Sequence, residues 1–154
     1  PLKGRGIHLT VPVRGGSVLL IDDSYNASPP SMHAALATLA AIPAGAGRRI
    51  AVLGDMLELG TRGPALHRAL AADIAQFGID LVFAAGPNMA HLWDALPAER
   101  RGYHADNSAD LAPHVVAAAR PGDTLLVKGS FGSRMGMVID ALLAHGGRNG
   151  AVGG

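Results

Sequence analysis

Two neighbouring carboxylates stand where a run of apolar residues ends in this 154-residue sequence. Asp22 and Asp23 directly follow the apolar residues 18–21, and small polar residues and two prolines come after them. Adjacent aspartates in this position are either turn and helix-capping residues or half of a ligand-binding site. The local sequence leaves both possibilities open.

Other apolar runs are followed by polar side chains in the same way: Asp55, Glu58, Asn88, Asp106, Asn107, Lys128, Ser130 and Arg134. Lys128 constrains the structure most, because an isolated ammonium at the end of a buried strand is very costly without an anionic partner. We expect Asp55 or Glu58 on a neighbouring loop to supply that partner. We also expect the ammonium to point into a cleft between the loops.

The apolar runs indicate strands that are buried on both faces. Four runs lack the alternation of apolar and polar residues that a half-exposed strand has: residues 18–21, 50–53, 81–84 and 124–127. Continuous apolar runs of this kind are typical of a parallel sheet covered by helices on both faces. Apolar spacings of three and four predict the helices between them, near residues 32–40, 66–77, 88–96, 111–118 and 135–142.

Alternating strands and helices predict a doubly wound α/β sheet that is mostly parallel. Residues 7–13 differ, because apolar and other residues alternate there and a turn at residues 14–17 follows. This pattern predicts a β-hairpin with one antiparallel strand. Pro12 places that strand at an edge, since proline cannot donate to a neighbouring strand. The polar residues therefore gather at the carboxyl ends of parallel strands, where open α/β sheets bind ligands.

The composition and the missing motifs exclude several classes of protein and of site. With 49% hydrophobic and 16% charged residues the chain is globular, and a net charge of +1 gives no basic surface for nucleic acid. It has no cysteine, no P-loop, no GxGxxG and no histidine spacing for a metal site. No apolar run is long enough for a membrane span. We expect one cytoplasmic domain at residues 1–145 and a flexible tail at residues 146–154.

Three stretches carry a resemblance to a known family: DDSYNASPPSM (residues 22–32), GDMLELG (residues 54–60) and LLVKGSFGSRM (residues 125–135). In this order and spacing they resemble the C-terminal domain of the Mur ligases. The resemblance covers residues 5–143, and its first two motifs are most similar to members that join D-alanyl-D-alanine to UDP-MurNAc-tripeptide. It implies a Rossmann-like, six-stranded sheet with one antiparallel strand and helices on both faces.

The resemblance also implies that this chain is the third domain of a cytoplasmic enzyme. Its own N-terminal domain would hold the UDP-sugar peptide, and its central domain would bind most of the ATP and magnesium. The tripeptide carboxylate would become an acyl phosphate, which the amine of D-alanyl-D-alanine attacks. This domain would close over ATP and bind the dipeptide, and alone it would be inactive.

Carried over residue by residue, the resemblance assigns two groups. Arg5, Asp23 and Asn26 would approach the nucleotide, with Asp22 a weaker candidate. Lys128 would be catalytic, and the residues facing the dipeptide would be Tyr25, Asp55, Glu58, Ser130 and Arg134.

Two positions depart from the family pattern. Ser28 stands where many relatives have asparagine, and it can still cap a helix before Pro29. Phe131 stands where many relatives have arginine, so we move the pairing with the dipeptide carboxylate to Arg134, whose guanidinium can make two parallel bonds.

Two other interpretations remain open at this point. A phospho-receiver signalling domain also places acidic residues and a lysine after its strands, as Asp22, Asp23, Asp55 and Lys128 do here. A Mur-type ligase for a different amino acid is the second.

Overall fold

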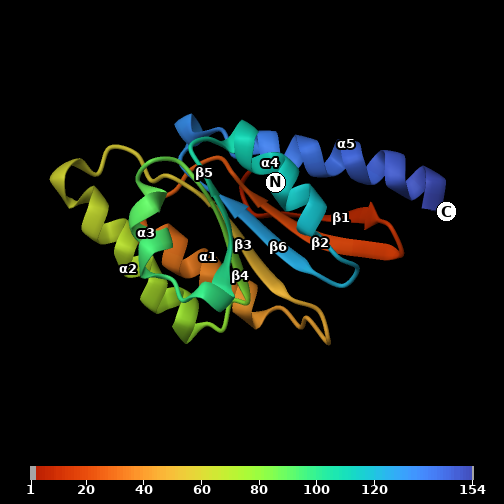
Figure 1. Ribbon diagram of the computed structural model, residues 1–154, viewed down its shortest axis with the longest axis horizontal. Helices are drawn as coiled ribbons and strands as arrows, with labels where there is room; N and C mark the ends of the chain where they lie inside the picture. Colours follow the sequence, from red (N-terminus) through yellow and green to blue (C-terminus); the bar gives the residue numbers. More distant parts are fainter. Residues whose placement is uncertain (1–2, 154) are drawn as a thin grey trace.

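The computed structural model describes the backbone of residues 3–153 and the side chains of residues 3–146. Six strands form one sheet in the order β1-β2-β6-β3-β4-β5 (Figure 1). Their bounds are β1 Ile7–Val13, β2 Gly16–Asp23, β3 Arg49–Gly54, β4 Leu81–Ala85, β5 Arg101–Ala105 and β6 Thr124–Lys128.

The strand pairing confirms the predicted fold class. β1 is antiparallel to β2, and every other neighbouring pair is parallel. Pro12 lies in β1 at the edge of the sheet, opposite Ser17, so its missing N–H costs the sheet no internal bond.

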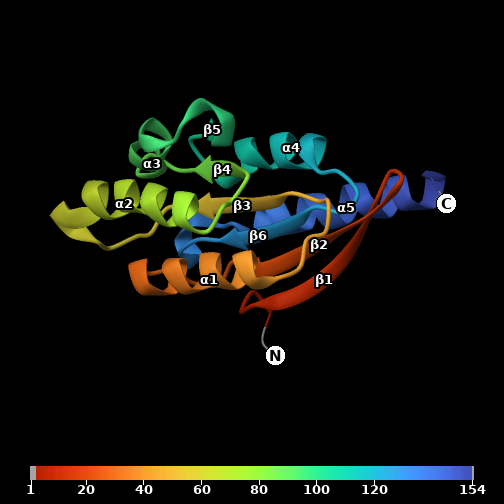
Figure 2. The same cartoon turned by 90° about the horizontal axis from the view of Figure 1, so that it is seen from below.

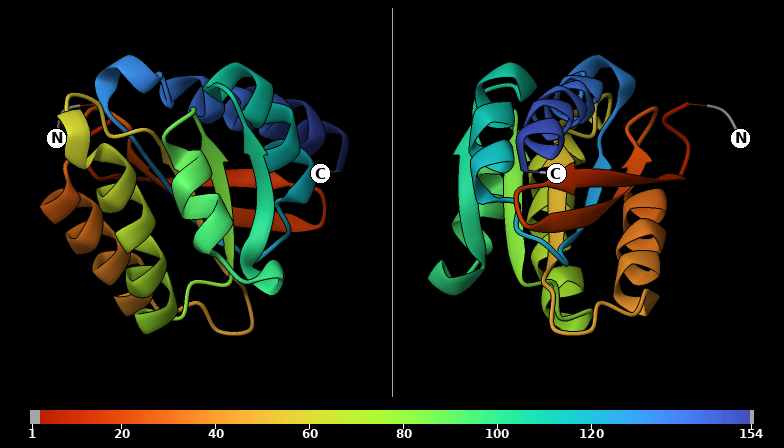
Figure 3. Two further views of the ribbon diagram at one scale, coloured as in Figure 1. Left: turned by 60° about the vertical axis from the view of Figure 1, so that its left-hand side comes forward. Right: turned by 90° about the vertical axis from the view of Figure 1, so that its right-hand side faces the viewer.

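Five α-helices cover the two faces of the sheet: α1 Pro29–Ala41, α2 Gly63–Gln76, α3 Met89–Ala95, α4 Ser108–Ala118 and α5 Gly136–Gly153. Helices α1, α2 and α3 pack on one face and α4 and α5 on the other, as Figures 1 and 3 show. Successive residues of β6 enter opposite cores, Leu126 with α1 and α2, Leu125 and Val127 with α4 and α5. Burial on both faces explains why these strands lack alternation.

Local chemistry explains where α1 begins. The Ser28 hydroxyl accepts the Ser31 N–H, and the Ser31 hydroxyl accepts the Ser28 N–H, which makes a reciprocal capping box. Pro29 occupies the first turn, where a missing N–H costs nothing. The prediction that serine can still cap this helix is confirmed.

Helix α5 packs alongside the β1–β2 hairpin (Figure 2). A Cβ on Gly146 would lie 2.5 Å from the Pro12 carbonyl oxygen, so only glycine allows this approach. The proposed tail at residues 146–154 begins inside α5, whose helix extends to Gly153. The side chains of residues 147–154 lie outside the described part, and the flexibility of the tail stays a prediction.

The strand order also excludes one interpretation. In a receiver-type sheet the first parallel strand lies between the second and third. Here the parallel neighbour of β2 is β6, which separates β2 from β3. The receiver alternative is therefore wrong. The loops after β2, β6 and β3 lie in that order along the carboxyl ends of the parallel strands.

Candidate active site

An ion pair joins the ends of β2 and β6. Asp23 and Lys128 are direct partners in the parallel register, and the Lys128 Nζ donates to Asp23 Oδ2 at 2.7 Å and to the Asn26 carbonyl at 3.0 Å. The lysine side chain is 4% exposed and that of Asp23 25%. The expectation that Asp55 or Glu58 would be the partner is wrong, because the parallel register places Asp23 directly opposite Lys128 on β2, whereas the residue opposite it on β3 is Leu53.

The position of Lys128 also corrects the expected orientation of its ammonium. The ammonium is enclosed by Asp23 and Asn26, and the residue lines neither of the two pockets described below. A buried ammonium with two acceptors is well satisfied. Any direct contact with a substrate therefore requires these bonds to change.

The two adjacent aspartates have different surroundings. The buried Asp22 accepts the Ser24 N–H at 3.2 Å and the Ser24 hydroxyl at 2.6 Å through one oxygen, which is turn chemistry. Asp23 holds the lysine instead. Asp22 therefore has the turn role that the sequence allowed, whereas Asp23 forms an internal ion pair and its part in a ligand-binding site stays a prediction.

Asp55 organises the loop after β4. Its buried carboxylate accepts the N–H groups of Asn88 at 3.1 Å and Met89 at 2.9 Å, at the start of α3. Gly86 makes this possible, since its φ is +112° and a Cβ there would lie 2.4 Å from the Asp55 carboxyl carbon. Asp55 is thus tied to α3.

Ser130 connects the loop after β6 to the loop after β3. Its N–H donates to the Asp55 carbonyl at 3.1 Å, and its hydroxyl accepts the Leu57 N–H at 2.9 Å. The residue is buried. Glu58 follows as an exposed residue in the left-handed region, at φ +63°. Of the two, Ser130 fastens loops together while Glu58 faces solvent.

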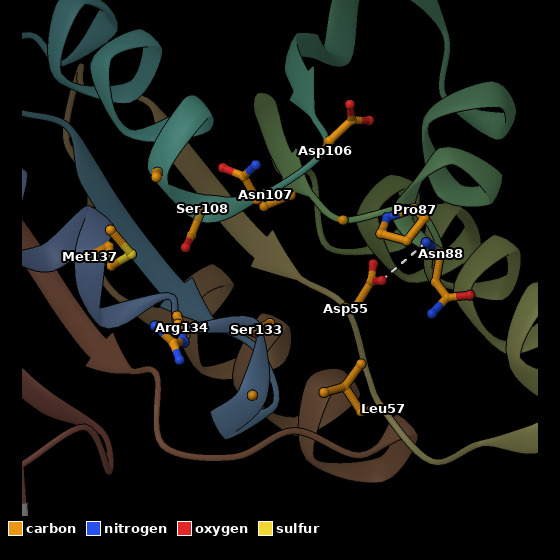
Figure 4. A pocket seen from close by; sticks show the side chains of 14 residues that line it. Asp55, Leu57, Pro87, Asn88, Asp106, Asn107, Ser108, Ser133, Arg134 and Met137 are labelled. Atoms are coloured by element: carbon orange, nitrogen blue, oxygen red, sulfur yellow. Dashed lines mark hydrogen bonds between the residues drawn. The ribbon is translucent and has the colours of Figure 1, made fainter.

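A pocket of about 540 Å³ lies between these loops (Figure 4). Arg134 and Met137 lie on one side, and Asp55 and Asn88 on the other. Its remaining lining residues are Leu57, Ala85, Gly86, Pro87, Asp106, Asn107, Ser108, Ala109, Gly132 and Ser133. The pocket therefore has an exposed cation on one side and a carboxylate with amide groups on the other.

A second pocket, of about 910 Å³, adjoins the first along residues 132–137. Tyr25 and Phe131 line it, with ring centroids 5.5 Å apart, and the Arg5 guanidinium lies 4.1 Å over the Tyr25 ring. Tyr25 is 43% exposed and Phe131 72%. Aromatic faces beside a guanidinium suit a flat or anionic ligand.

Of the assigned residues, the structure brings Asp55 to the smaller pocket, Tyr25 to the larger one and Arg134 to both. Asn26 is exposed beside Tyr25, and its side-chain oxygen accepts the Ala27 N–H. The assigned residues that line neither pocket are Arg5, Asp23, Asn26, Glu58, Ser130 and Lys128.

Sequence reasoning missed several lining residues. It placed Asn88 and Asn107 at this edge without a role, and it did not mention Ser108 or include Met137. Asn107 caps α4 by accepting the Asp110 N–H at 2.8 Å, so an asparagine before a helix was the available signal. Ser108 and Met137 belong to helices, and no motif marks them. Within the described residues, no group of three or more His, Asp or Glu side chains could hold a metal ion.

The sequence was compared with known protein families. Residues 10–131 match the family model described as "Mur ligase, glutamate ligase domain". The chain belongs to the Mur ligase family. None of the helices in the described part combines the length and apolar character needed to cross a membrane.

Curated relatives carry a more specific name. The chain is 40% identical over 137 residues to the UDP-N-acetylmuramoyl-tripeptide–D-alanyl-D-alanine ligase of Synechocystis sp., covering 85% of this chain and 29% of the relative. It is 38% identical over 130 residues to the ligase of the same name from Escherichia coli, covering 83% of this chain and 27% of the relative. This Mur ligase domain is therefore homologous to that ligase, which is called MurF.

Solved structures agree. MurF from Thermotoga maritima in complex with ADP superposes with a TM-score of 0.77 at 25% identity, over 96% of this chain and 32% of that one. A MurF structure from Acinetobacter baumannii gives 0.78 at 25% identity, over 93% and 31%. The chain thus spans about a third of the length of these relatives.

Proposed function

We propose that this chain is the C-terminal domain of an ATP-dependent ligase that joins D-alanyl-D-alanine to UDP-MurNAc-tripeptide in the cytoplasm, during synthesis of the peptidoglycan precursor. One observation carries the proposal beyond the family. In the smaller pocket the exposed Arg134 lies on the side opposite the carboxylate of Asp55. A zwitterionic amine substrate has opposite charges at its two ends, which fits such a pocket, and D-alanyl-D-alanine is the amine named for relatives that are 40% and 38% identical to this chain.

In this proposal Arg134 binds the dipeptide carboxylate through its guanidinium. Asn88 and Ser108 line the same pocket and offer an amide and a hydroxyl group for the peptide link, whereas the Asn107 amide is already bonded to Asp110. Asp55 lies at the end where the amine would sit, although two backbone N–H groups already share its carboxylate. The chain's own contribution is thus to hold the amine in one orientation.

The chemistry follows from the bonds that change. The tripeptide carboxylate takes the γ-phosphoryl group of ATP, giving ADP and an acyl phosphate. The ammonium group of the dipeptide first loses a proton to become a neutral amine. The amine then attacks the acyl carbon, an amide bond forms, the nitrogen loses a second proton and inorganic phosphate leaves. A domain that closes over the intermediate helps by orienting the amine and excluding water.

The larger pocket supports a nucleotide contact. The exposed Tyr25 ring and the Arg5 guanidinium offer a stacking face and a positive charge, and Asn26 adjoins them. We propose that this side approaches ATP and that Asp23 reaches it with its exposed quarter. Within the described part no group of three or more acidic or histidine side chains suits magnesium.

Lys128, Ser130 and Glu58 line neither pocket and have other roles in this proposal. Lys128 holds Asp23 and the Asn26 carbonyl, so we propose that it orders the loop of residues 24–28 and becomes catalytic only when the closed enzyme rearranges the pair. Ser130 orders the loop after β3 in the same way. Glu58, exposed at the loop tip, is free to meet substrate on closure.

A Mur-type ligase for a different amine is the alternative. Both proposals are tested by measuring ADP release from the full-length parent enzyme with UDP-MurNAc-tripeptide and ATP. We expect release to require D-alanyl-D-alanine and the isolated 154-residue chain to release none. Equal release with L-alanine or D-glutamate as the amine would support the alternative, and steady release by the isolated chain would refute the assignment as one domain of a larger enzyme.

A further inference from the structure

A fully buried histidine connects α2 to the loop after β3. His67 has no exposed surface and lines neither pocket. Its Nδ1 lies 2.7 Å from the Gly63 carbonyl oxygen, and its Nε2 lies 3.0 Å from the Met56 amide nitrogen. One imidazole therefore joins two backbone groups from separate segments.

The two backbone partners determine which ring nitrogen of His67 carries a proton. A carbonyl oxygen only accepts, so Nδ1 must donate to Gly63. An amide N–H only donates, so Nε2 must accept from Met56 with its lone pair. The ring is thus held as the neutral Nδ1–H tautomer, and a proton on Nε2 would oppose the Met56 N–H.

The Met56 bond is one of three that fix this loop. The N–H groups of Asp55, Met56 and Leu57 donate in turn to the end of β4, to His67 and to Ser130. Three consecutive backbone N–H groups therefore donate to three different segments of the chain. Without such bonds, a loop that ends in a left-handed non-glycine residue would be free to relax.

The position of this loop sets one wall of the smaller pocket. Asp55 and Leu57, on either side of Met56, both line that pocket. The fit is close, because a Cβ on Gly132 would lie 2.8 Å from Leu57 Cδ1. A rotation of the Met56 peptide plane would therefore move both lining side chains.

We propose that His67 is a positioning residue for the amine substrate: through its Nε2 it holds the Met56 amide and so fixes the pocket wall formed by Asp55 and Leu57. It touches no substrate itself. The proposal rests on the proposed ligase function for the identity of the amine, but the hydrogen bond and its effect on the loop can be measured independently.

The test compares two matched variants of the full-length enzyme. In His67→Asn the amide can occupy the place of Nδ1 and donate to Gly63, but it cannot reach Met56. In His67→Gln the amide oxygen can occupy the place of Nε2 and accept from Met56, while the Gly63 bond is lost. Each variant loses one hydrogen bond, so a purely structural role predicts similar effects of the two variants on hydrogen exchange and on the kinetics.

The two readouts are hydrogen exchange at residues 55–58 and steady-state kinetics with D-alanyl-D-alanine and ATP. We expect His67→Asn to lose protection at the Met56 amide and to raise the dipeptide KM about tenfold. The ATP KM should change less than about threefold, because the second pocket is untouched. In His67→Gln both protection and dipeptide KM should stay near those of the wild type.

Equal Met56 protection in both variants, or equal dipeptide KM values, would overturn the proposal. If the wild-type enzyme does not use the dipeptide, the proposed function fails. The exchange comparison then decides the role of His67 alone, since loss of protection confined to His67→Asn would still support it.

Discussion

The Asp23–Lys128 pair gives the sharpest stability prediction, because its two members differ in exposure. Asp23→Ala leaves a 4% exposed ammonium with the Asn26 carbonyl as its remaining acceptor. Breaking a buried pair in this way costs about 3–5 kcal/mol. Since the Asp23 side chain is 25% exposed, water reaches the site, and we expect the lower end of that range, about 3 kcal/mol.

Lys128→Met should cost much less. It keeps most of the side-chain bulk, removes the buried charge, and leaves a carboxylate that can turn towards water, so we expect a loss of about 1 kcal/mol. The double variant should then cost far less than the sum of the two, with a coupling energy of about 2 kcal/mol.

Urea unfolding of the 154-residue chain measures these differences. With an m-value of about 1.5 kcal/mol/M, Asp23→Ala should lower the midpoint by about 2 M and Lys128→Met by less than about 1 M. If both single variants lost less than about 0.5 kcal/mol, the pair would behave like a surface ion pair. If Lys128→Met were the more costly change, the reasoning from burial would be refuted.

Three further predictions concern the loops, a helix cap and the pocket. Gly86→Ala should lower the unfolding free energy by at least about 2 kcal/mol, because its Cβ would meet the Asp55 carboxylate. The control Gly78→Ala, which has open space at a positive φ, should lower it by about 1 kcal/mol, and equal losses in thermal melts would contradict this reasoning. Ser28→Ala should cost about 1 kcal/mol in urea unfolding by removing the N-cap of α1, and no loss would show the cap to be dispensable. Arg134→Met should leave stability within about 0.5 kcal/mol and raise the dipeptide KM about tenfold in the full-length enzyme; an unchanged KM would remove Arg134 from the site.

The fold was predictable because its signals are local. Non-alternating apolar runs, helical spacings between them and Pro12 in an alternating run were sufficient to predict a mostly parallel sheet with an antiparallel edge. The cap at Ser28 was equally readable, since a capping box needs only residues three apart.

The partner of Lys128 could not be predicted, because it depends on strand order and register. On one side of β6 the residue opposite Lys128 is Asp23, and on the other it is Leu53, two residues before Asp55. Both strands carry acidic residues near their ends, so the sequence alone does not determine which carboxylate reaches the ammonium. The contacts of Ser130 could not be predicted for a similar reason, since the bond from the Leu57 N–H to its hydroxyl joins residues 73 apart in sequence.

His67 shows a different limit. The sequence does not show which groups a histidine on an apolar helix face will bond. The proposed role of His67 depends on its bond to Met56, which lies 11 residues earlier in the loop after β3. Asn88, Asn107 and Ser108 likewise become pocket residues only when the loops after β4 and β5 lie beside residues 132–137.

The most direct test of the proposed function is a competition between amines in the full-length parent enzyme. The enzyme is given ATP, UDP-MurNAc-tripeptide and an equimolar mixture of D-alanyl-D-alanine, L-alanine, D-glutamate and a diamino acid, and the products are identified by mass spectrometry. We expect one new product, the tripeptide extended by D-alanyl-D-alanine. A product that carries any of the other amines in place of the dipeptide would contradict the proposed function.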